Sequence, residues 1–389
     1  MEYEHSEDIK LLRQTIREFA DKEVRPLARE LDEQERVPFE TLHKAAELGL
    51  LGLPFPEKYG GAEAGIMGYC IMMEEMNRVC ASTATIIGAH AQLCGMSIYL
   101  AGSEAQKDKY LRALVEGRKF GAWALTEPNA GSDAAHIRTT AELRGDEWVL
   151  NGQKMWITNG SFADVIVVFA ATDKALGARG GITAFIVEKD FPGFKSGKPE
   201  EKMGLRGSHT SALFFEDCRV PKANVLGQIG HGFATAMQTL DIGRCGLGAG
   251  SLGAAKEAFE MSRRYAVERH QFGHPIANFQ AIQFKLAEMA VKIYTMEQIV
   301  YDCAKRVDSG QHATLESSIV KLYCSETASQ IVDEAIQIHG GMGYSRELPL
   351  ERMYRDGRIT RIFEGTNEIQ KHVIAGELLR QIGYKIKLY

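Results

Sequence analysis

The sequence predicts an α+β protein with helices at both ends and a β domain between them. Hydrophobic residues recur at helical spacing through the first third of the chain. The middle of the chain instead holds short runs rich in β-branched residues, separated by turn signals. The helical pattern then returns in segments of more than twenty residues, a length that suits a bundle. We therefore expect a helical domain over residues 1–119, a β domain over residues 120–228 and a helical bundle over residues 229–389.

The N-terminal block is expected to contain several helices. Leu12, Ile16 and Phe19 recur at helical spacing with charges between them, and Pro and Gly clusters near residues 54–61 break the pattern. The most apolar stretch, residues 81–101, still holds polar residues such as His90. A buried helix explains it better than a membrane span does.

The middle and C-terminal blocks give clearer elements. We expect strands over residues 149–157, 164–171, 182–188 and 212–216. We expect long helices over residues 233–266, 279–309 and 313–339. The first of these helices carries a row of glycines at 243, 246, 248, 250 and 253, and glycine costs about 1 kcal/mol per helical site relative to alanine. Either a ligand or another backbone approaches closely there, or two helices pack tightly.

Composition limits the function. The 46 basic and 51 acidic residues give a net charge of −5, which argues against nucleic acid or an anionic membrane as a partner. Seven cysteines without a C-x-x-C pair predict reduced thiols, no disulfide framework and no metal site. The first ten residues, MEYEHSEDIK, resemble neither a signal peptide nor an Arg-rich transit peptide. We expect a cytoplasmic protein, or one of the mitochondrial matrix if a transit peptide has been removed.

Two segments of the middle block have features of a cofactor site. The loop W-A-L-T-E-P-N-A-G-S-D (residues 123–133) presents the hydroxyls of Thr126 and Ser132, which would suit the polar edge of a planar cofactor. In W-I-T-N, Trp156 and Thr158 would wall and bind an aromatic ring system. Seen singly, the loop is more often a plain turn, and Trp156 more often ordinary core.

Two further segments lie in the bundle. In R-H-Q-F-G (residues 269–273), Arg269 offers a fork of donors to a pyrophosphate, or is an exposed salt-bridging residue. In Q-I-H-G-G-M-G (residues 337–343), a glycine pair ends a helix and would let a phosphate or adenosine approach. This segment is not a G-x-G-x-x-G loop within a βαβ unit, so a nicotinamide site is disfavoured. His339 alone is more often structural than catalytic.

The fifth segment, R-I-F-E-G-T-N-E-I-Q (residues 361–370), contains the candidate catalytic base. Glu364 follows two apolar residues, and a carboxylate in apolar surroundings gains a raised pKa that suits a general base. Gly365 permits close approach of a ligand. The alternative is a solvated Glu364 beside a helix that Thr366 caps.

With these five segments in this order, the chain closely resembles the acyl-CoA dehydrogenase family over nearly its whole length. The resemblance implies an N-terminal helical domain, a central β-barrel-like domain and a C-terminal helical bundle, with FAD between the last two. It implies an acyl-CoA substrate, an electron-transfer flavoprotein as redox partner and a homotetramer.

The resemblance also assigns site residues. Cofactor-binding residues would be Trp123, Leu125, Thr126, Ser132, Trp156, Thr158, Arg269, Phe272, Gln280, Gln337, Gly340, Gly341, Thr366 and Glu368, some of them acting across a subunit interface. Substrate-binding residues would be Ser132, Asp241, Arg244 and Gly365. Glu364 would remove the α-proton of the thioester while the β-hydrogen leaves as hydride to flavin N5.

Several alternatives stay open. Some members of the family carry the base on a bundle helix, at the position matched here by Gly243, so this chain would use the commoner arrangement with Glu364. No Arg lies between Arg78 and Arg112 to pair with a carboxylated acyl group, and we expect a short, C4-like substrate. Branched, cyclic or medium-chain substrates, a flavin-dependent enoyl-CoA reductase and a non-catalytic acyl-CoA-binding protein are the rival hypotheses.

Overall fold

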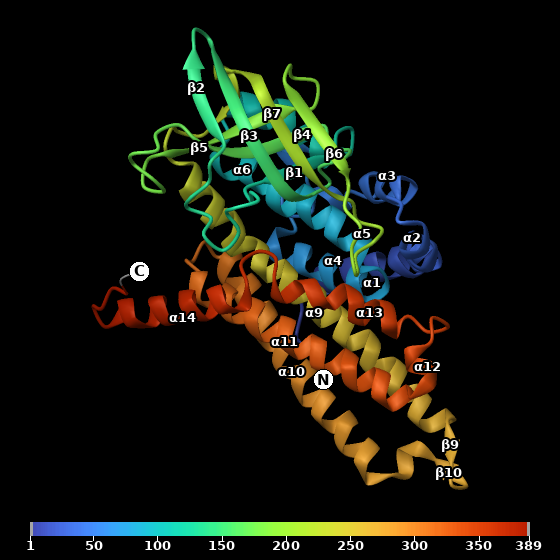
Figure 1. Cartoon of the computed structure of the whole chain (residues 1–389). Helices are drawn as coiled ribbons and strands as arrows, with labels where there is room; N and C mark the ends of the chain where they lie inside the picture. Colours follow the sequence, from blue (N-terminus) through green and yellow to red (C-terminus); the bar gives the residue numbers. More distant parts are fainter. Residues whose placement is uncertain (1–2, 387–389) are drawn as a thin grey trace.

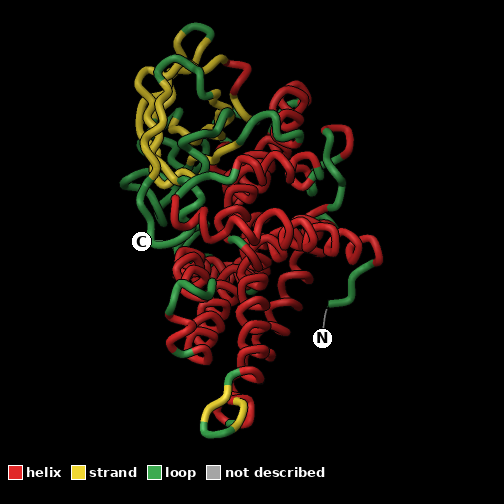
Figure 2. Tube along the Cα trace, turned by 90° about the vertical axis from the view of Figure 1, so that its right-hand side faces the viewer, coloured by secondary structure: helices red, strands yellow, loops and turns green. Residues whose placement is uncertain are grey.

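The computed structural model describes residues 3–386 and shows a sheet domain above a body of helices (Figure 1). The side view in Figure 2 places the strands at one end of the molecule and a small hairpin at the other. Helices before and after the sheet in sequence pack together beneath it. The α+β class expected from the sequence is confirmed.

The N-terminal helices are short except for α1 and α4. They are α1 (Glu7–Phe19), α2 (Ala28–Gln34), α3 (Phe39–Glu47), α4 (Gly65–Val79), α5 (Ala81–Ile87), α6 (Met96–Ala101), α7 (Glu104–Gln106) and α8 (Arg112–Val115). Ser6 caps α1 by accepting a hydrogen bond from the backbone N–H of Ile9, and Glu7 and Asp8 lie in the favourable first turn.

The apolar stretch Ala81–Ala101 forms a nearly continuous helix in which a π-helical segment, Gly88–Gly95, joins α5 to α6. In length and composition it passes for a membrane span, but 72% of its apolar window is buried inside the protein. A buried helix, as expected from its polar residues, fits this burial. π-Helical segments are rare and frequently lie at functional sites.

The sheet contains β1 (Gly121–Ala124), β2 (Thr140–Arg144), β3 (Glu147–Thr158), β4 (Val165–Ala171), β5 (Ile182–Glu188), β6 (Phe194–Pro199), β7 (Thr210–Pro221) and β8 (Val225–Leu226). Its order is β6-β7-β3-β2-β4-β5-β8, with β1 parallel to β4. The four expected strands correspond to β3, β4, β5 and part of β7. Strand β1 is the strand expected directly before the loop at residues 123–133, whereas β2, β6 and β8 were not expected, because they are short or polar and depend on pairing with their neighbours.

The C-terminal block contains α9 (Gly232–Glu268), α10 (Gln280–Asp308), α11 (Thr314–His339), α12 (Gly341–Tyr344), α13 (Leu350–Gly357) and α14 (Asn367–Gln381). The three expected long helices agree with α9, α10 and α11 to within a few residues. A hairpin of β9 (His270–Gln271) and β10 (His274–Pro275), which the sequence did not predict, joins α9 to α10. It forms the tip farthest from the sheet (Figure 1).

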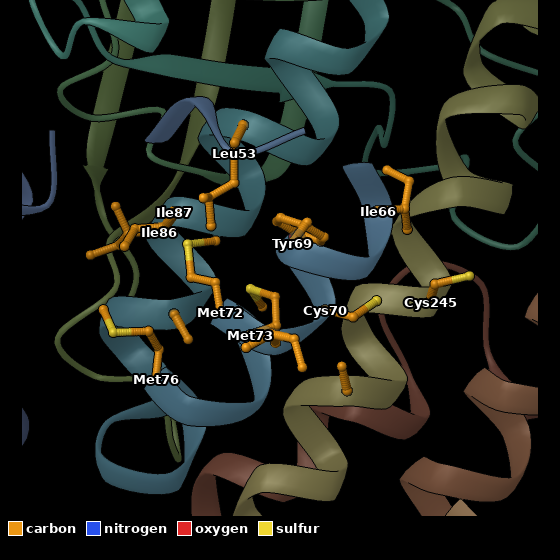
Figure 3. Packing of buried hydrophobic residues seen from close by; sticks show 14 of the residues in the cluster. Leu53, Ile66, Tyr69, Cys70, Met72, Met73, Met76, Ile86, Ile87 and Cys245 are labelled. Carbon is orange, nitrogen blue, oxygen red and sulfur yellow. The ribbon is translucent and has the colours of Figure 1, made fainter. Parts of the chain in front are cut away.

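The main core lies where α4 crosses α9. Figure 3 shows Tyr69, Met72 and Met76 of α4 packed with Ile86 and Ile87 of α5. The glycine row of α9 makes this packing possible. A Cβ on Gly246 would stand 2.2 Å from the Tyr69 ring, and one on Gly253 2.0 Å from the Glu74 carbonyl oxygen. Tight helix packing therefore explains most of the row.

The seven cysteines are all buried free thiols. Among the described residues, no cluster of His, Cys, Asp or Glu could hold a metal ion.

Candidate active site

A cavity of about 1300 Å³ lies between the β domain, α4 and α5, and the bundle helices α9, α11 and α13. Ligand pockets usually occupy roughly 300–1000 Å³, so this one accepts a large ligand or two ligands together. It is lined by many of the predicted site residues: Trp123, Leu125, Thr126, Ser132, Trp156, Thr158, Arg244, Glu364 and Gly365. Segments more than two hundred residues apart thus meet at one site.

Trp156 faces the cavity because β3 is irregular beside it. The register of β3 against β7 shifts between Lys154 and Ile157, and Trp156 has a φ of +60°. Bulges of this kind re-aim a side chain. With 54% of its surface exposed, Trp156 forms a wall of the cavity. The reading of Trp156 as ordinary core is therefore wrong.

A buried ion pair anchors the loop that carries Thr126 and Ser132. Lys154 is fully buried; its Nζ donates to Glu127 Oε1 at 2.7 Å and to the Leu125 carbonyl oxygen at 3.0 Å. Glu127 in turn accepts hydrogen bonds from the backbone N–H groups of Arg138 and Thr139. Burial lowers the pKa of Lys154 to about 8, although Glu127 opposes the shift. The loop's shape is thus fixed from behind, away from the cavity.

Glu364 lies in the short loop between a 3₁₀ turn (Arg358–Arg361) and α14. Its φ is +55°, a strained value for a non-glycine residue, and strained residues cluster at functional sites. Its Oε2 is shielded from solvent and has no hydrogen-bond partner within residues 3–386. Thr366 caps α14 through the N–H of Ile369, as expected. The capping segment of the alternative reading is thus present, but Glu364 is half-buried with its Oε2 shielded rather than fully solvated.

The charge environment of Glu364 is mixed. Desolvation raises the pKa of its carboxyl to about 7, while Arg244 and Lys321 act to lower it. Arg244 Nε donates to the Glu364 carbonyl oxygen at 3.3 Å, and its Nη1 donates to Asp241 at 2.8 Å. A carboxyl with a pKa near neutrality is suited to proton transfer.

The sequence predicts that residues 81–100 contribute to the floor of the acyl pocket, and the structure places Gln92 of this stretch in the cavity wall, but neither Gln92 nor Lys321 was singled out as a site residue. Gln92 comes from the π-helical segment and lines the cavity, yet it is 1% exposed and neither polar atom of its side chain has a partner. It lies near Gly243, where a Cβ would stand 3.8 Å from Gln92 Cγ. The polar residues in the apolar stretch were the only signal for Gln92, and nothing in the sequence distinguished Lys321.

The remaining predicted residues do not line the cavity. Asp241, Thr366 and Glu368 lie close to it, on α9 or at the start of α14. The others are exposed around the far end of the bundle: Arg269, Phe272, Gln280, Gln337, Gly340 and Gly341. His339 at the end of α11 stacks on Tyr265 of α9 with ring centroids 4.4 Å apart, which fits a structural role for this histidine. These six residues, called the distal set below, therefore do not reach the cavity of their own chain.

Comparison with known protein families covers most of the chain. The family models match at residues 6–118 (acyl-CoA dehydrogenase, N-terminal domain), 122–218 (middle domain) and 230–379 (C-terminal domain). The chain belongs to the acyl-CoA dehydrogenase family. The family resemblance drawn from the five segments is thereby confirmed.

Individual members of the family are similar over the full length. The "Acyl-CoA dehydrogenase, short-chain specific" of Clostridium acetobutylicum is 45% identical over 98% of this chain and 100% of its own. The "Acryloyl-CoA reductase (NADH)" of Anaerotignum propionicum is 45% identical over 98% and 97%. The solved butyryl-CoA dehydrogenase from Megasphaera elsdenii superimposes with a TM-score of 0.95 at 42% identity, covering 98% and 100%. An acyl-CoA dehydrogenase complexed with FAD from Bacillus anthracis has a TM-score of 0.92 at 41% identity, covering 97% and 68%.

The cavity of this family member fits FAD. It is large enough for a dinucleotide beside a second ligand. The exposed side chain of Trp156 forms part of its wall, and the hydroxyl-bearing residues Thr126, Ser132 and Thr158 line it. Buried polar atoms without partners, at Glu364 and Gln92, face the same space.

Proposed function

We propose that this protein is an FAD-dependent dehydrogenase that converts a short-chain acyl-CoA to the trans-2-enoyl-CoA, with Glu364 as the base. The observation that carries the proposal is the carboxylate of Glu364, half-buried at the wall of a cavity large enough for flavin and thioester together, with its Oε2 shielded and unpaired. A scaffold protein has no use for a strained, desolvated carboxylate at such a place. The non-catalytic alternative is therefore disfavoured.

The base works because its environment suits the proton it takes. An α-proton beside a thioester is a weak acid, so a carboxylate of ordinary pKa is a poor acceptor. Desolvation makes Glu364 a stronger base, while Arg244 and Lys321 keep part of it ionised at neutral pH. The backbone N–H of Glu364 would stabilise the charge that develops on the thioester oxygen.

FAD would supply the acceptor for the hydride that leaves the β-carbon. Thr126, Ser132, Trp156 and Thr158 would hold its ring system and ribityl chain against the β domain. Arg244, Asp241 and Gly365 would orient the thioester end of the substrate so that its α-carbon faces Glu364. Substrate bound in the cavity would exclude water from the carboxylate.

A C4-like acyl group is supported by two relatives, one named short-chain specific and the other a butyryl-CoA dehydrogenase. The reverse reaction, reduction of an enoyl-CoA, is favoured by the relative named acryloyl-CoA reductase, because the same residues would serve both directions. Dehydrogenation remains the proposal, and an electron-transfer flavoprotein is its proposed electron acceptor.

The distal set supports a homotetramer. Arg269, Phe272, Gln280 and the glycines at 340 and 341 would complete the cofactor site of a neighbouring copy, since they cannot reach the cavity of their own chain. Phe272 is 89% exposed, which a protein interface would relieve. Seven buried free thiols support an intracellular, reducing location such as the cytoplasm.

The test is an anaerobic titration of the FAD-loaded protein with saturated acyl-CoAs of four to twelve carbons, followed at the flavin absorbance band. We expect butyryl-CoA to bleach the flavin fastest. Faster bleaching by the C12 thioester would contradict the short-chain assignment. Failure of every acyl-CoA to bleach, with crotonyl-CoA reoxidising chemically reduced flavin, would favour the reductase.

A further inference from the structure

Glu326 of α11 ties together the two ends of the loop that carries Glu364. Arg361, before the loop, donates to Glu326 Oε2 at 3.2 Å. Asn367, after the loop, donates to Glu326 Oε1 at 2.8 Å. Helix α11 therefore holds both ends of the loop that carries the base, while Arg244 of α9 and Gln370 of α14 donate to the Glu364 carbonyl oxygen directly.

Lys321, one turn earlier on α11, completes the attachment. Its Nζ donates to Asn367 Oδ1 at 2.8 Å, and Asn367 Nδ2 donates to Ser325 Oγ at 3.0 Å. Lys321 and Ser325 are 0% exposed, and Asn367 is 2% exposed. Asn367 thus has both its carbonyl and its amide group satisfied by α11, which fixes the first turn of α14.

The ammonium group of Lys321 has no ion-pair partner within 4.0 Å in the described part of the chain. Burying a charge without a direct partner is costly, and an apolar residue of similar length would be more stable there if Lys321 only filled space. The strongest opposite charge acting on it is Glu364. The cost is explained if the charge serves the base.

We propose that Lys321 is a positioning residue of the proposed dehydrogenation: its hydrogen bond to Asn367 holds the start of α14 and with it the Glu364 loop, and its positive charge favours the ionised carboxylate. This inference rests on the proposed function of Glu364. Other charged or titratable groups around the base are Arg244 and Asp241 of α9, Glu326 of α11, Glu368 of α14 and Tyr69 of α4. Arg244, which acts on the carboxylate more strongly, is hydrogen-bonded to Asp241 and to the Glu364 carbonyl oxygen, and Lys321 is the second cation that acts on the carboxylate.

Three variants separate the effect of the hydrogen bond between Lys321 and Asn367, called the latch below, from the effect of the Lys321 charge. Lys321→Met removes both, Lys321→Gln keeps a donor for Asn367 but removes the charge, and Asn367→Ala keeps the ammonium but removes the latch. The readout is the pH dependence of flavin reduction by butyryl-CoA in stopped flow, with FAD content and melting temperature measured in parallel.

Lys321→Gln should raise the pH midpoint of flavin reduction by about one unit, so that it reduces about tenfold more slowly than the wild type at pH 6 and nearly equally at pH 9. Lys321→Met should show the same shift of the midpoint together with a lower rate at every pH, because it also loses the hydrogen bond to Asn367. Asn367→Ala should lower the rate at every pH while leaving the midpoint within a few tenths of a unit. A wild-type midpoint in Lys321→Gln would overturn the proposal. Should Lys321→Met fail to fold, Lys321→Gln decides.

A second readout does not depend on turnover. The infrared carboxyl band that is lost in Glu364→Gln reports the titration of Glu364 in protein without acyl-CoA. Its midpoint should rise in Lys321→Gln. If no acyl-CoA reduces the wild-type flavin but this midpoint still rises, the proposed function fails and the assignment of Lys321 stands; an unchanged midpoint overturns the assignment.

Discussion

A Cβ atom on Gly243 would stand 3.0 Å from Oε2 of Glu364. The backbone of α9 and the carboxylate of the loop before α14 therefore meet at one point. A carboxylate that started from position 243 would reach the space that Glu364 now occupies. Gly243 also leaves Glu364 without a side chain in its way.

The short distance between these two positions predicts that a carboxylate at position 243 can replace Glu364 as the base. Glu364→Gly should lower the rate of flavin reduction about 10²- to 10⁴-fold, the usual contribution of a general base. The double variant Gly243→Glu/Glu364→Gly should recover at least tenfold of this loss in anaerobic stopped flow. Gly243→Glu alone, with two carboxylates in one place, serves as the control and should be slow. No recovery in the double variant would contradict the geometry.

The pKa of Glu364 predicts a pH profile. Since the carboxyl must be ionised to accept a proton and burial raises its pKa to about 7, flavin reduction should slow about tenfold for each unit below pH 7 and level off above pH 8. Glu364→Gln should bind FAD and show no reduction at any pH between 6 and 9.

The stability of the folded protein should change with pH in the opposite direction to the rate of flavin reduction. The folded-state pKa of Glu364 is above its unfolded value of 4.5, so the native protein binds this proton more tightly, and its stability falls as pH rises from 4.5 to 7. Glu364→Gln should therefore raise the melting temperature at pH 8 and leave it unchanged at pH 4. Equal effects at both values would contradict desolvation as the cause.

The buried pair of Lys154 and Glu127 predicts a loss of both stability and cofactor. Lys154→Met leaves Glu127 buried without its cation, which costs about 3–5 kcal/mol. It should also lower the FAD-to-protein ratio, because the loop with Thr126 and Ser132 loses its anchor. Urea unfolding and the absorbance ratio measure the two effects. Lys154→Met/Glu127→Gln should recover part of the stability; a double variant as weak as the sum of its single changes would speak against the pair.

Gln92 predicts a change in substrate preference. Its side-chain amide is buried in the cavity wall and has no hydrogen-bond partner. When an apolar acyl chain fills the space beside it, the unsatisfied amide destabilises the complex by about 1–3 kcal/mol. Gln92→Leu should raise kcat/KM for butyryl-CoA and hexanoyl-CoA several-fold, with hexanoyl-CoA gaining more. A loss of activity on both would instead assign the amide a role in the reaction. Gln92→Asn, which keeps the amide, is the matched control.

The distal residues predict a coupling between assembly and cofactor. Phe272→Ala removes the most exposed aromatic side chain of the β9–β10 hairpin and should shift the protein from tetramer toward smaller species in light scattering. FAD retention should fall with it, and Arg269→Ala should lower FAD retention without changing the assembly. A monomeric wild type that retains FAD would refute the shared site.

The sequence predicted those helices and strands whose own residues carry a clear hydrophobic pattern. The long apolar periodicity of α9, α10 and α11 and the β-branched runs of β3, β4 and β5 gave the helices and strands within a few residues. Strands β2 and β6 and the hairpin at residues 270–275 escaped it, because short polar strands are stabilised by partners elsewhere in the chain.

The sequence by itself determined the α+β class, the order of the five segments and, through them, the family with its candidate base at Glu364. Only the tertiary structure decided the state of that base. The environment of Glu364 depends on Gly243, Arg244 and Lys321, which belong to other helices. Desolvation results from the packing of these segments around the carboxyl, and the residues next to Glu364 in the sequence do not determine it. The same reason separates Trp156 in the cavity wall from Arg269 at the far tip of the bundle: both belong to a specific motif, but only packing fixes which surface each one faces.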